Sequence, residues 1–157
     1  MTNPQRKKLE IIQASALDLL RINIALTRYD QYNKAIQSPK SLEKDAGEHF
    51  IYIDTVSQKS LGYLKLMKTN LSGTCWLQSF LILPDYIGQG YGRQFFCDFF
   101  KNYIQPRNYS RIYLTCHLDN TSARQFWSSL GFHKYNDRDN IMPVYEKAAY
   151  DLYYLDL

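Results

Sequence analysis

The chain has 157 residues and a formal net charge of +4; 45% of its residues are apolar and 22% are charged. This length fits one domain with a hydrophobic core, which we expect to span residues 1–157, and the composition excludes disorder over most of the chain. The basic residues are scattered, so a nucleic-acid binder with a concentrated basic stripe is not predicted. No apolar run approaches the roughly 20 residues of a membrane-spanning helix.

The cysteines indicate a reduced protein. Cys75, Cys97 and Cys116 are odd in number, widely spaced and form no CxxC pair, so neither a disulfide framework nor a metal site is predicted. The first residues, MTNPQRKKLEII, lack the apolar run of a signal peptide. Together these observations predict a cytoplasmic location, no membrane association and no bound metal.

The first half of the chain predicts a strand, a helix and then three strands in succession. Ser15 and Asp18 have the spacing of a capping box at the start of the helix. The apolar residues that indicate this helix recur at helical spacing: Leu17, Leu20 and Ile24. The polar segment 37–48 is expected to be a loop. The four strands are expected at residues 8–13, 49–56, 61–67 and 75–83.

The second half predicts two helices and three further strands. A helix over 91–104 places aromatic side chains on one face, namely those of Phe95, Phe96, Phe99, Phe100 and Tyr103. A strand over 112–118 alternates, with one face formed by Ile112, Leu114, Cys116 and Leu118. A short helix follows and ends near Gly131, a typical position for glycine after a helix. The last two strands are separated by a polar turn at 136–140.

The expected element order is β-α-β-β-β-α-β-α-β-β. Antiparallel strands come first, and a strand–helix–strand crossover lies in the middle. This order predicts an α/β (α+β) fold with one mixed, mostly antiparallel twisted sheet of about seven strands and helices packed on it.

The most informative segment is LILPDYIGQGYG, residues 81–92. A strand ends near Pro84, glycines alternate at positions 88, 90 and 92, and an amphipathic helix begins at once. Several backbone N–H groups are therefore left unpaired at a helix N-terminus, where the helix dipole also favours an anion. Glycine allows a close approach of phosphate oxygens to the backbone. The segment predicts a phosphate or pyrophosphate site.

Two common phosphate-binding motifs do not fit this segment. A Walker A loop needs Gly-Lys-Ser/Thr, whereas Gly92 is followed by Arg93 and Gln94. A dinucleotide-binding fingerprint needs G-x-G-x-x-G, and Arg93 stands where the third glycine belongs. A glycine turn without any ligand remains the alternative.

A third motif fits. The run from Pro84 to Gly92 resembles the acetyl-CoA loop of the GNAT superfamily of N-acetyltransferases, whose usual form is R/Q-x-x-G-x-G/A after a strand. The segment from Asn120 to Phe132 resembles a later motif of that family, N-x-x-A-x-x-F/L-Y-x-x-x-G-F. Both motifs occur in the expected order, separated by one helix and one strand. The chain is therefore identified as a member of this superfamily with a GNAT-like fold.

The resemblance implies an enzyme that transfers an acetyl group from acetyl-CoA to an amine of a small molecule or peptide. The strand before the turn should separate from the 112–118 strand, and the pantetheine arm should lie between them, bonded to the backbone of Ile82 and Leu83. Gly88 should shape the approach of the pyrophosphate, and the backbone N–H groups of the next five residues should bind it: Gln89, Gly90, Tyr91, Gly92 and Arg93. The side chain of Asn120 should bond the pantetheine arm, cap the following helix, or do both.

The sequence departs from the family in three places. Ile87 stands at the usual Arg or Gln position, which removes either one phosphate contact or a structural hydrogen bond. Trp127 stands where a tyrosine usually protonates the thiolate; an indole is too weak an acid, so Trp127 is expected to be a wall of the cofactor pocket or a core residue. Thr115 stands where some relatives have a catalytic glutamate. His117 lies on the same strand face and is our candidate for proton transfer.

Two other hypotheses remain open. The chain could be an acyl-CoA-binding module with attenuated catalysis, as the changes at Ile87 and Trp127 would suggest. It could also be an interaction protein that uses its aromatic C-terminal segment, MPVYEKAAYDLYYLDL, as a homodimer or partner surface. Neither the acceptor nor the preferred acyl chain is indicated by the sequence.

Overall fold

The computed structural model describes residues 8–26, 47–136 and 149–157, and its strands form one sheet in the order β1-β2-β3-β4-β5-β7-β6. Neighbouring strands are antiparallel except for β4 and β5. The expected fold class and element order are therefore confirmed. The strands are β1 (Leu9–Gln13), β2 (Glu48–Asp54), β3 (Lys59–Lys68), β4 (Thr74–Ile82), β5 (Arg111–His117), β6 (His133–Lys134) and β7 (Tyr150–Asp156). The described helices are α1 (Ala16–Leu26), α3 (Tyr91–Phe99) and α4 (Thr121–Ser129).

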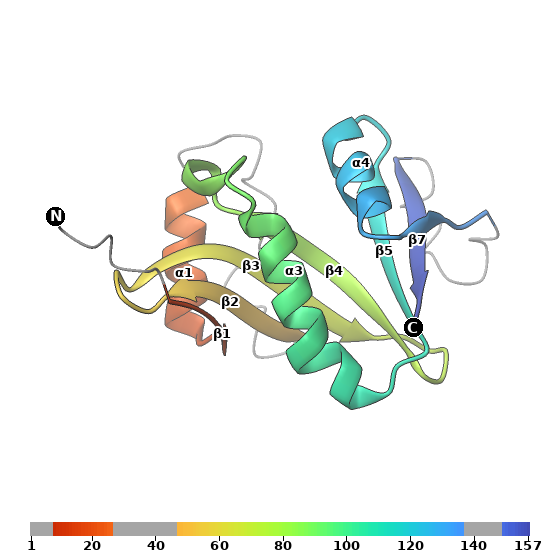
Figure 1. Cartoon of the computed structure of the whole chain (residues 1–157), viewed down its shortest axis with the longest axis horizontal. Coiled ribbons are helices and arrows are strands. Elements are labelled where there is room, and N and C mark those ends of the chain that lie inside the picture. The colour runs from red at the N-terminus through yellow and green to blue at the C-terminus, as the bar shows by residue number, and fades with distance from the viewer. Residues whose placement is uncertain (1–7, 27–46, 137–148) are drawn as a thin grey trace, which may run out of the picture.

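The helices cover both faces of the sheet. Figure 1 shows α3 in front of β3 and β4, α4 in front of β5 and β7, and α1 behind β2 and β3. Because side chains alternate along a strand, Phe50 and Tyr52 of β2 join the apolar cluster under α3, whereas Ile51 joins the cluster under α1. In the described part of the chain, none of the helices is long and apolar enough to cross a membrane.

The aromatic face of α3 is confirmed as the centre of the larger cluster. Phe95 has no exposed surface and stacks on Tyr52, with ring centroids 4.7 Å apart. The Tyr52 hydroxyl donates to Asp98 Oδ2 at 3.0 Å, and burial together with this carboxylate raises the pKa of Tyr52. The helix expected over 91–104 is present, but only Tyr91–Phe99 is α-helical. The chain continues directly as a π-helical turn (Phe100–Ile104) and a 3₁₀ turn (Gln105–Arg107).

Helix α1 begins as expected but buries a different face. The Ser15 N–H donates to Asp18 Oδ2 at 2.9 Å and the Asp18 N–H donates to Ser15 Oγ at 3.2 Å, which is the reciprocal pattern of a capping box. The side chains facing the sheet are those of Leu19, Ile22 and Leu26. The stripe that indicated the helix from sequence lies on the exposed side: Leu17, Leu20 and Ile24. The expected loop 37–48 lies outside the described residues up to position 46; β2 begins at Glu48.

Strands β4 and β5 are paired at one end only. Their parallel pairing runs from Thr74–Arg111 to Leu77–Leu114 and then stops. At the same level the pairing of β4 with β3 shifts by one residue, from Leu77–Leu66 to Ser79–Lys65, so β4 carries a bulge at Gln78. A bulge bends a strand and increases its twist. We attribute the separation of β4 from β5 beyond Leu77 to this bend.

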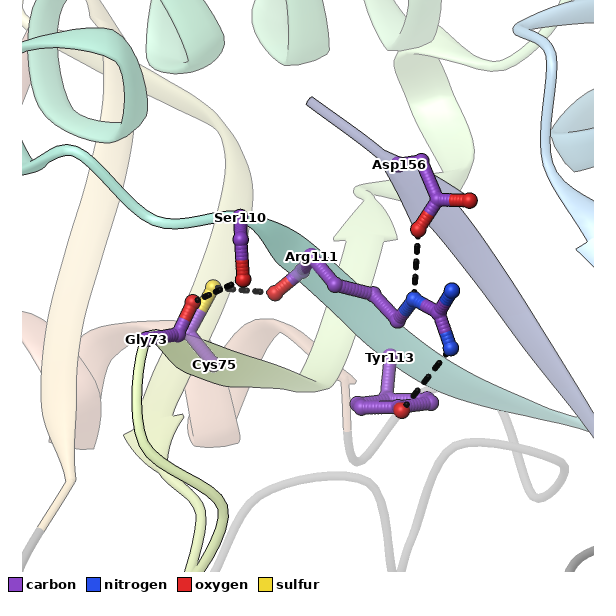
Figure 2. Close-up of polar contacts among 6 residues, drawn as sticks. All are labelled: Gly73, Cys75, Ser110, Arg111, Tyr113 and Asp156. Carbon is purple, nitrogen blue, oxygen red and sulfur yellow. Dashed lines mark hydrogen bonds and ion pairs between the residues drawn. The ribbon is translucent and has the colours of Figure 1, made fainter.

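A group of polar contacts closes the paired end, as Figure 2 shows. The Ser110 N–H and Oγ both donate to the Gly73 carbonyl, at 2.7 and 3.1 Å. Arg111 Nε donates to Asp156 Oδ1 at 2.5 Å and Arg111 Nη1 donates to the Tyr113 hydroxyl at 3.3 Å; these two partners raise the pKa of Arg111. These contacts tie β5 to the β3–β4 turn and to β7, so the two strands can diverge only at the opposite end.

The crossover after β5 ends in a helix cap. At the end of α4, the Gly131 N–H donates to the Ser128 carbonyl and the Phe132 N–H donates to the Trp127 carbonyl, and Gly131 has a φ of +94°. This is the Schellman pattern, which confirms glycine at the position expected from sequence. Leu118, expected to continue the buried face of β5, lies beyond the strand and is 40% exposed. The turn expected at 136–140 lies outside the described residues apart from Asn136.

Candidate functional site

A cleft of about 870 Å³ opens where β4 separates from β5, on the side of the sheet that α3 and α4 cover. Its walls come from the end of β4, the glycine turn, the start of α3, the end of β5 and the first turns of α4. The lining residues are Phe80, Leu81, Ile82, Tyr86, Ile87, Gly88, Gly90, Gly92, Arg93, His117, Asp119, Asn120, Ser122, Ala123, Phe126 and Trp127. The structure thus brings the two sequence motifs to opposite walls of one cleft.

The glycine turn has the backbone that only glycine adopts easily. Gly88 has a φ of +79° and Gly90 a φ of +83°, both in the left-handed region. A Cβ atom built on either residue would have no heavy atom within 4 Å, so both open directly onto free space in the cleft. A group as large as a pyrophosphate therefore fits against the backbone here. Gly92 differs, because a Cβ there would lie 3.4 Å from the Phe126 ring of α4.

The start of α3 presents N–H donors beside this space. Its first hydrogen bond runs from the Gln94 N–H to the Gly90 carbonyl at 3.2 Å, so the N–H groups of Gly92 and Arg93 lie in the first turn, before the first intrahelical hydrogen bond. The Gln89 side chain turns back, with Nε2 donating to the Asp85 carbonyl at 3.0 Å. These donors and the dipole of α3 suit an anion.

The backbone of β4 presents donors and acceptors along the gap. The Leu83 N–H donates to the Leu61 carbonyl of β3 at 2.8 Å, and the Leu83 carbonyl accepts from the Tyr86 N–H at 2.9 Å. Because backbone groups of successive strand residues point to opposite edges, those of Ile82 and Phe80 point away from β3, into the gap. Ile82 lines the cleft, whereas Leu83 lies outside its lining and is 8% exposed.

Asn120 begins α4 at the edge of the cleft. Its Oδ1 accepts from the Ala123 N–H at 3.0 Å, so the side chain caps the helix. The side-chain amide nitrogen is a separate group that is not used by this cap. The capping role weighed from sequence is confirmed, and it leaves the amide N–H groups available to a ligand in the cleft.

Arg93 of α3 and Trp127 of α4 both line the cleft. Arg93 Nη2 donates to Ser129 Oγ at 2.8 Å, which joins the first turn of α3 to the last turn of α4. Trp127 is 6% exposed and packs edge-to-face on Phe80, with ring centroids 5.1 Å apart. Trp127 belongs to the core and also lines the cleft. Ile87 is 55% exposed at the rim of the cleft.

Few ionisable side chains line the cleft. They are those of Tyr86, Arg93, His117 and Asp119. His117 Nδ1 accepts from the Asp119 N–H at 3.2 Å and lies 3.8 Å from Asp119 Oδ2. Nδ1 is the acceptor in this bond, so Nε2 is the ring nitrogen that the contact with Asp119 does not use. The ring also packs edge-to-face on Tyr150 of β7, with centroids 5.2 Å apart.

Cysteine chemistry and metal binding find no support near the cleft. Burial raises the pKa of the Cys116 thiol on β5 to about 11 and that of Cys75 to about 12, so both thiols stay protonated near neutral pH. Cys97 is exposed and does not line the cleft. Among residues 8–26, 47–136 and 149–157, no three His, Cys, Asp or Glu side chains are grouped as metal ligands.

Several lining residues escaped the sequence analysis. Phe126 and Ala123 lie within the motif at residues 120–132, but no role in a site was predicted for them. Phe80 lies two residues before Ile82 on β4, so strand alternation alone would have placed both at the same edge. Tyr86 and Asp119 lie in turns, where no periodic pattern is present to identify them.

Comparisons with known proteins agree with this geometry. The model of the acetyltransferase (GNAT) family matches residues 18–132. An acetyltransferase from Thermus thermophilus superposes with a TM-score of 0.74 at 20% identity, covering 96% of this chain and 97% of that one.

Two further solved structures share the fold at lower identity. The ribosomal-protein-S18-alanine N-acetyltransferase of Escherichia coli has a TM-score of 0.68 at 18% identity and covers 95% and 94% of the two chains. A dodecameric spermidine N-acetyltransferase from Vibrio cholerae has a TM-score of 0.70 at 16% identity, and the match covers 94% of this chain and 93% of that one. A search of curated proteins gives no significant match.

Proposed function

Because the chain belongs to the GNAT acetyltransferase family and is an acyl-CoA-dependent N-acyltransferase, we propose that it transfers an acetyl group from acetyl-CoA to an amine of a small molecule or peptide. The observation that carries the proposal is the cleft between β4 and β5, which opens at Gly88 and Gly90 onto the first N–H groups of α3. A neutral amine would attack the acyl carbon of the thioester; the C–N bond of the amide would form as the C–S bond breaks, and CoA would leave as a thiolate and take up the proton that the amine loses.

The donor would bind mainly through backbone groups. The N–H groups from Gln89 to Arg93 would hold the pyrophosphate, and the Ile82 backbone would bond the pantetheine arm. Leu83, assigned the same role from sequence, has both backbone groups bonded within the protein, so we give its place to Phe80. The missing side-chain contact at Ile87 weakens this binding without removing the backbone donors.

Asn120 offers a way to separate donor binding from stability. Asn120→Ser keeps an oxygen for the α4 cap but loses the amide, whereas Asn120→Ala loses both. If the amide donates to the pantetheine arm, both variants bind acetyl-CoA several-fold more weakly, and only Asn120→Ala loses about 1 kcal/mol of stability. Titration calorimetry and urea unfolding measure the two effects. Equal affinity of the Ser variant and the wild type would restrict Asn120 to capping.

The transfer itself would rest on positioning and on one histidine. Among the described residues, Asp119 is the only carboxylate in the cleft lining, and the thiols of Cys116 and Cys75 are protonated, which supports direct transfer without an acyl-enzyme. We assign His117 to proton transfer at the end of β5. Holding the amine beside the acyl carbon would supply much of the rate enhancement.

His117 variants test this assignment. We expect His117→Ala to lower kcat more than tenfold and to remove one limb of the pH–rate profile, while the Kd for acetyl-CoA changes less than threefold. His117→Gln, which keeps a hydrogen-bonding side chain but cannot titrate, should lose the same limb. A wild-type rate and profile in both variants would show that His117 transfers no proton.

The acceptor is an amine whose identity the fold does not specify. Neighbours with this fold act on a ribosomal-protein alanine and on spermidine, so a peptide with an N-terminal alanine and spermidine are the first acceptors to screen. We propose a single GNAT-like domain acting in the cytoplasm. A homodimer is a further proposal, consistent with a neighbour that is dodecameric.

Thermal unfolding with separate ligands tests the proposed function. Acetyl-CoA, CoA, ATP and NADH are added one at a time, each in large excess. A ligand at about 100 times its Kd stabilises the folded state by about 2.7 kcal/mol, which raises Tm by several degrees in a domain of this size. We expect a shift with acetyl-CoA and CoA alone. No shift with either would refute the proposed donor site.

A further inference from the structure

The inner end of the cleft is closed by apolar side chains. The gap between β4 and β5 ends where their pairing resumes, at Leu77 and Leu114, which are 4% and 2% exposed. Both belong to the core cluster on the side of α3 and α4. A ligand anchored at the glycine turn and lying along β4 passes Ile82 and then Phe80, the last residue of β4 that lines the cleft before the strands pair again at Leu77.

Phe80 is the central residue of the closure. Its ring lines the cleft and is surrounded by other rings on its remaining sides. The ring centroid of Phe80 lies 5.2 Å from that of Phe95, 5.9 Å from that of Phe126 and 5.1 Å from that of Trp127. Phe95 and Trp127 are buried, at 0% and 6% exposed. The space behind Phe80 is therefore filled by aromatic side chains.

We propose that Phe80, supported by Trp127, restricts the donor to a short acyl chain such as acetyl or propionyl. This inference rests on the proposed function and defines the donor class for the same site. A longer chain at the closed end would need space that the Phe80 ring occupies. Packed interiors adjust little to extra methylene groups, so the added carbons would clash with the Phe80 ring.

An open end of the cleft would give the opposite order of affinities. If that end were open and apolar, each buried CH₂ of the acyl chain would strengthen binding by about fourfold. Hexanoyl-CoA, with four more CH₂ groups than acetyl-CoA, would then bind much more tightly than acetyl-CoA. The relative affinity of the two donors therefore reports directly on whether Phe80 closes the site.

Removing the Phe80 ring should open the site. Phe80→Ala leaves an apolar space that adjoins the cleft, lined by Phe95, Phe126 and Trp127. Such spaces stay dry and accept apolar groups. Because Phe80 also belongs to the proposed donor site, the quantity compared is the ratio of the two affinities; we expect this ratio to move toward hexanoyl-CoA, since each buried CH₂ of a longer chain strengthens binding.

Titration calorimetry with acetyl-CoA and hexanoyl-CoA tests the proposal without an acceptor. In the wild type we expect hexanoyl-CoA to bind at least tenfold more weakly than acetyl-CoA. In Phe80→Ala the two should bind equally, or hexanoyl-CoA more tightly. Phe80→Leu, a smaller change, should shift the ratio of hexanoyl-CoA to acetyl-CoA affinity in the same direction. It replaces the Ala variant in the test if that variant does not fold. The control is Phe99→Leu, a buried aromatic outside the cleft lining that packs on Phe50.

The outcomes separate this inference from the proposed function. If the wild type binds both donors equally, the role of Phe80 is overturned but the proposed function is not. The same holds if Phe80 variants that bind acetyl-CoA show the wild-type ratio of hexanoyl-CoA to acetyl-CoA affinity. The role of Phe80 is also refuted if Phe99→Leu shifts this affinity ratio as much as Phe80→Leu does. Failure of the wild type to bind either donor removes the proposed function and this inference with it.

Discussion

Gly90→Asp is expected to reduce acetyl-CoA affinity at least 100-fold. Gly90 has a φ of +83° and opens onto free space in the cleft, so the introduced carboxylate would stand where the pyrophosphate is proposed to bind. Two unit charges about 4 Å apart near a protein surface repel by about 4 kcal/mol, which is about a thousandfold in affinity. The added side chain also strains the left-handed backbone. Calorimetric titration of acetyl-CoA measures the change.

Gly73→Asp is the matched control for this variant. Gly73 also has a positive φ, +72°, but it lies in the β3–β4 turn and outside the cleft lining. A Cβ there would lie 3.3 Å from Ser110 Oγ, so this variant introduces the same charge and a similar strain away from the proposed site. We expect it to lose stability and keep its acetyl-CoA affinity within about twofold. An unchanged affinity in Gly90→Asp would exclude the glycine turn as the pyrophosphate site.

Phe95→Ala is expected to cause the largest loss of stability of any change considered. Its side chain has no exposed surface and contacts Tyr52 and Phe80, on two different strands. Truncation of a buried phenylalanine removes its transfer free energy and leaves a cavity, together about 3–5 kcal/mol. For a chain of this length that lowers Tm by about 10 °C. Urea unfolding gives the free energy directly.

An exposed apolar residue provides the comparison. Ile87 is 55% exposed, and Ile87→Ala should change the free energy of unfolding by less than about 0.5 kcal/mol. A loss below about 1 kcal/mol in Phe95→Ala would contradict the packing of α3 on β2 and β4 described above. The same variant also removes a ring that packs on Phe80, so it tests whether Phe95 holds the Phe80 side chain in place in the cleft lining.

Local sequence patterns predicted much of the fold. The capping box at Ser15, the aromatic face of α3 and the glycine after α4 depend on residues close together in the chain, and all three are confirmed. The two motifs at residues 84–92 and 120–132 were expected to share a site. The structure places both in one cleft, because β4 and β5 are parallel and the segments that follow them therefore begin at the same end of the sheet, where the two strands separate.

Features that depend on distant partners were missed. Helix α1 carries apolar residues at helical spacing on two sides, and periodicity cannot tell which side faces the sheet. The exposed stripe that includes Leu20 therefore indicated the helix correctly but not its buried face. The bulge at Gln78 arises from the pairing of β4 with β3, and the bond of Leu83 to Leu61 depends on the same register. No local pattern records either one.

The central claim is that acetyl-CoA lies between β4 and β5 with its pyrophosphate on the start of α3. Backbone amide shifts in an NMR titration with acetyl-CoA test it most directly. We predict the largest changes at Gly90, Tyr91, Gly92 and Arg93, with smaller ones at Phe80 and Ile82. Saturating changes confined to other parts of the chain, with these amides unmoved, would contradict the account.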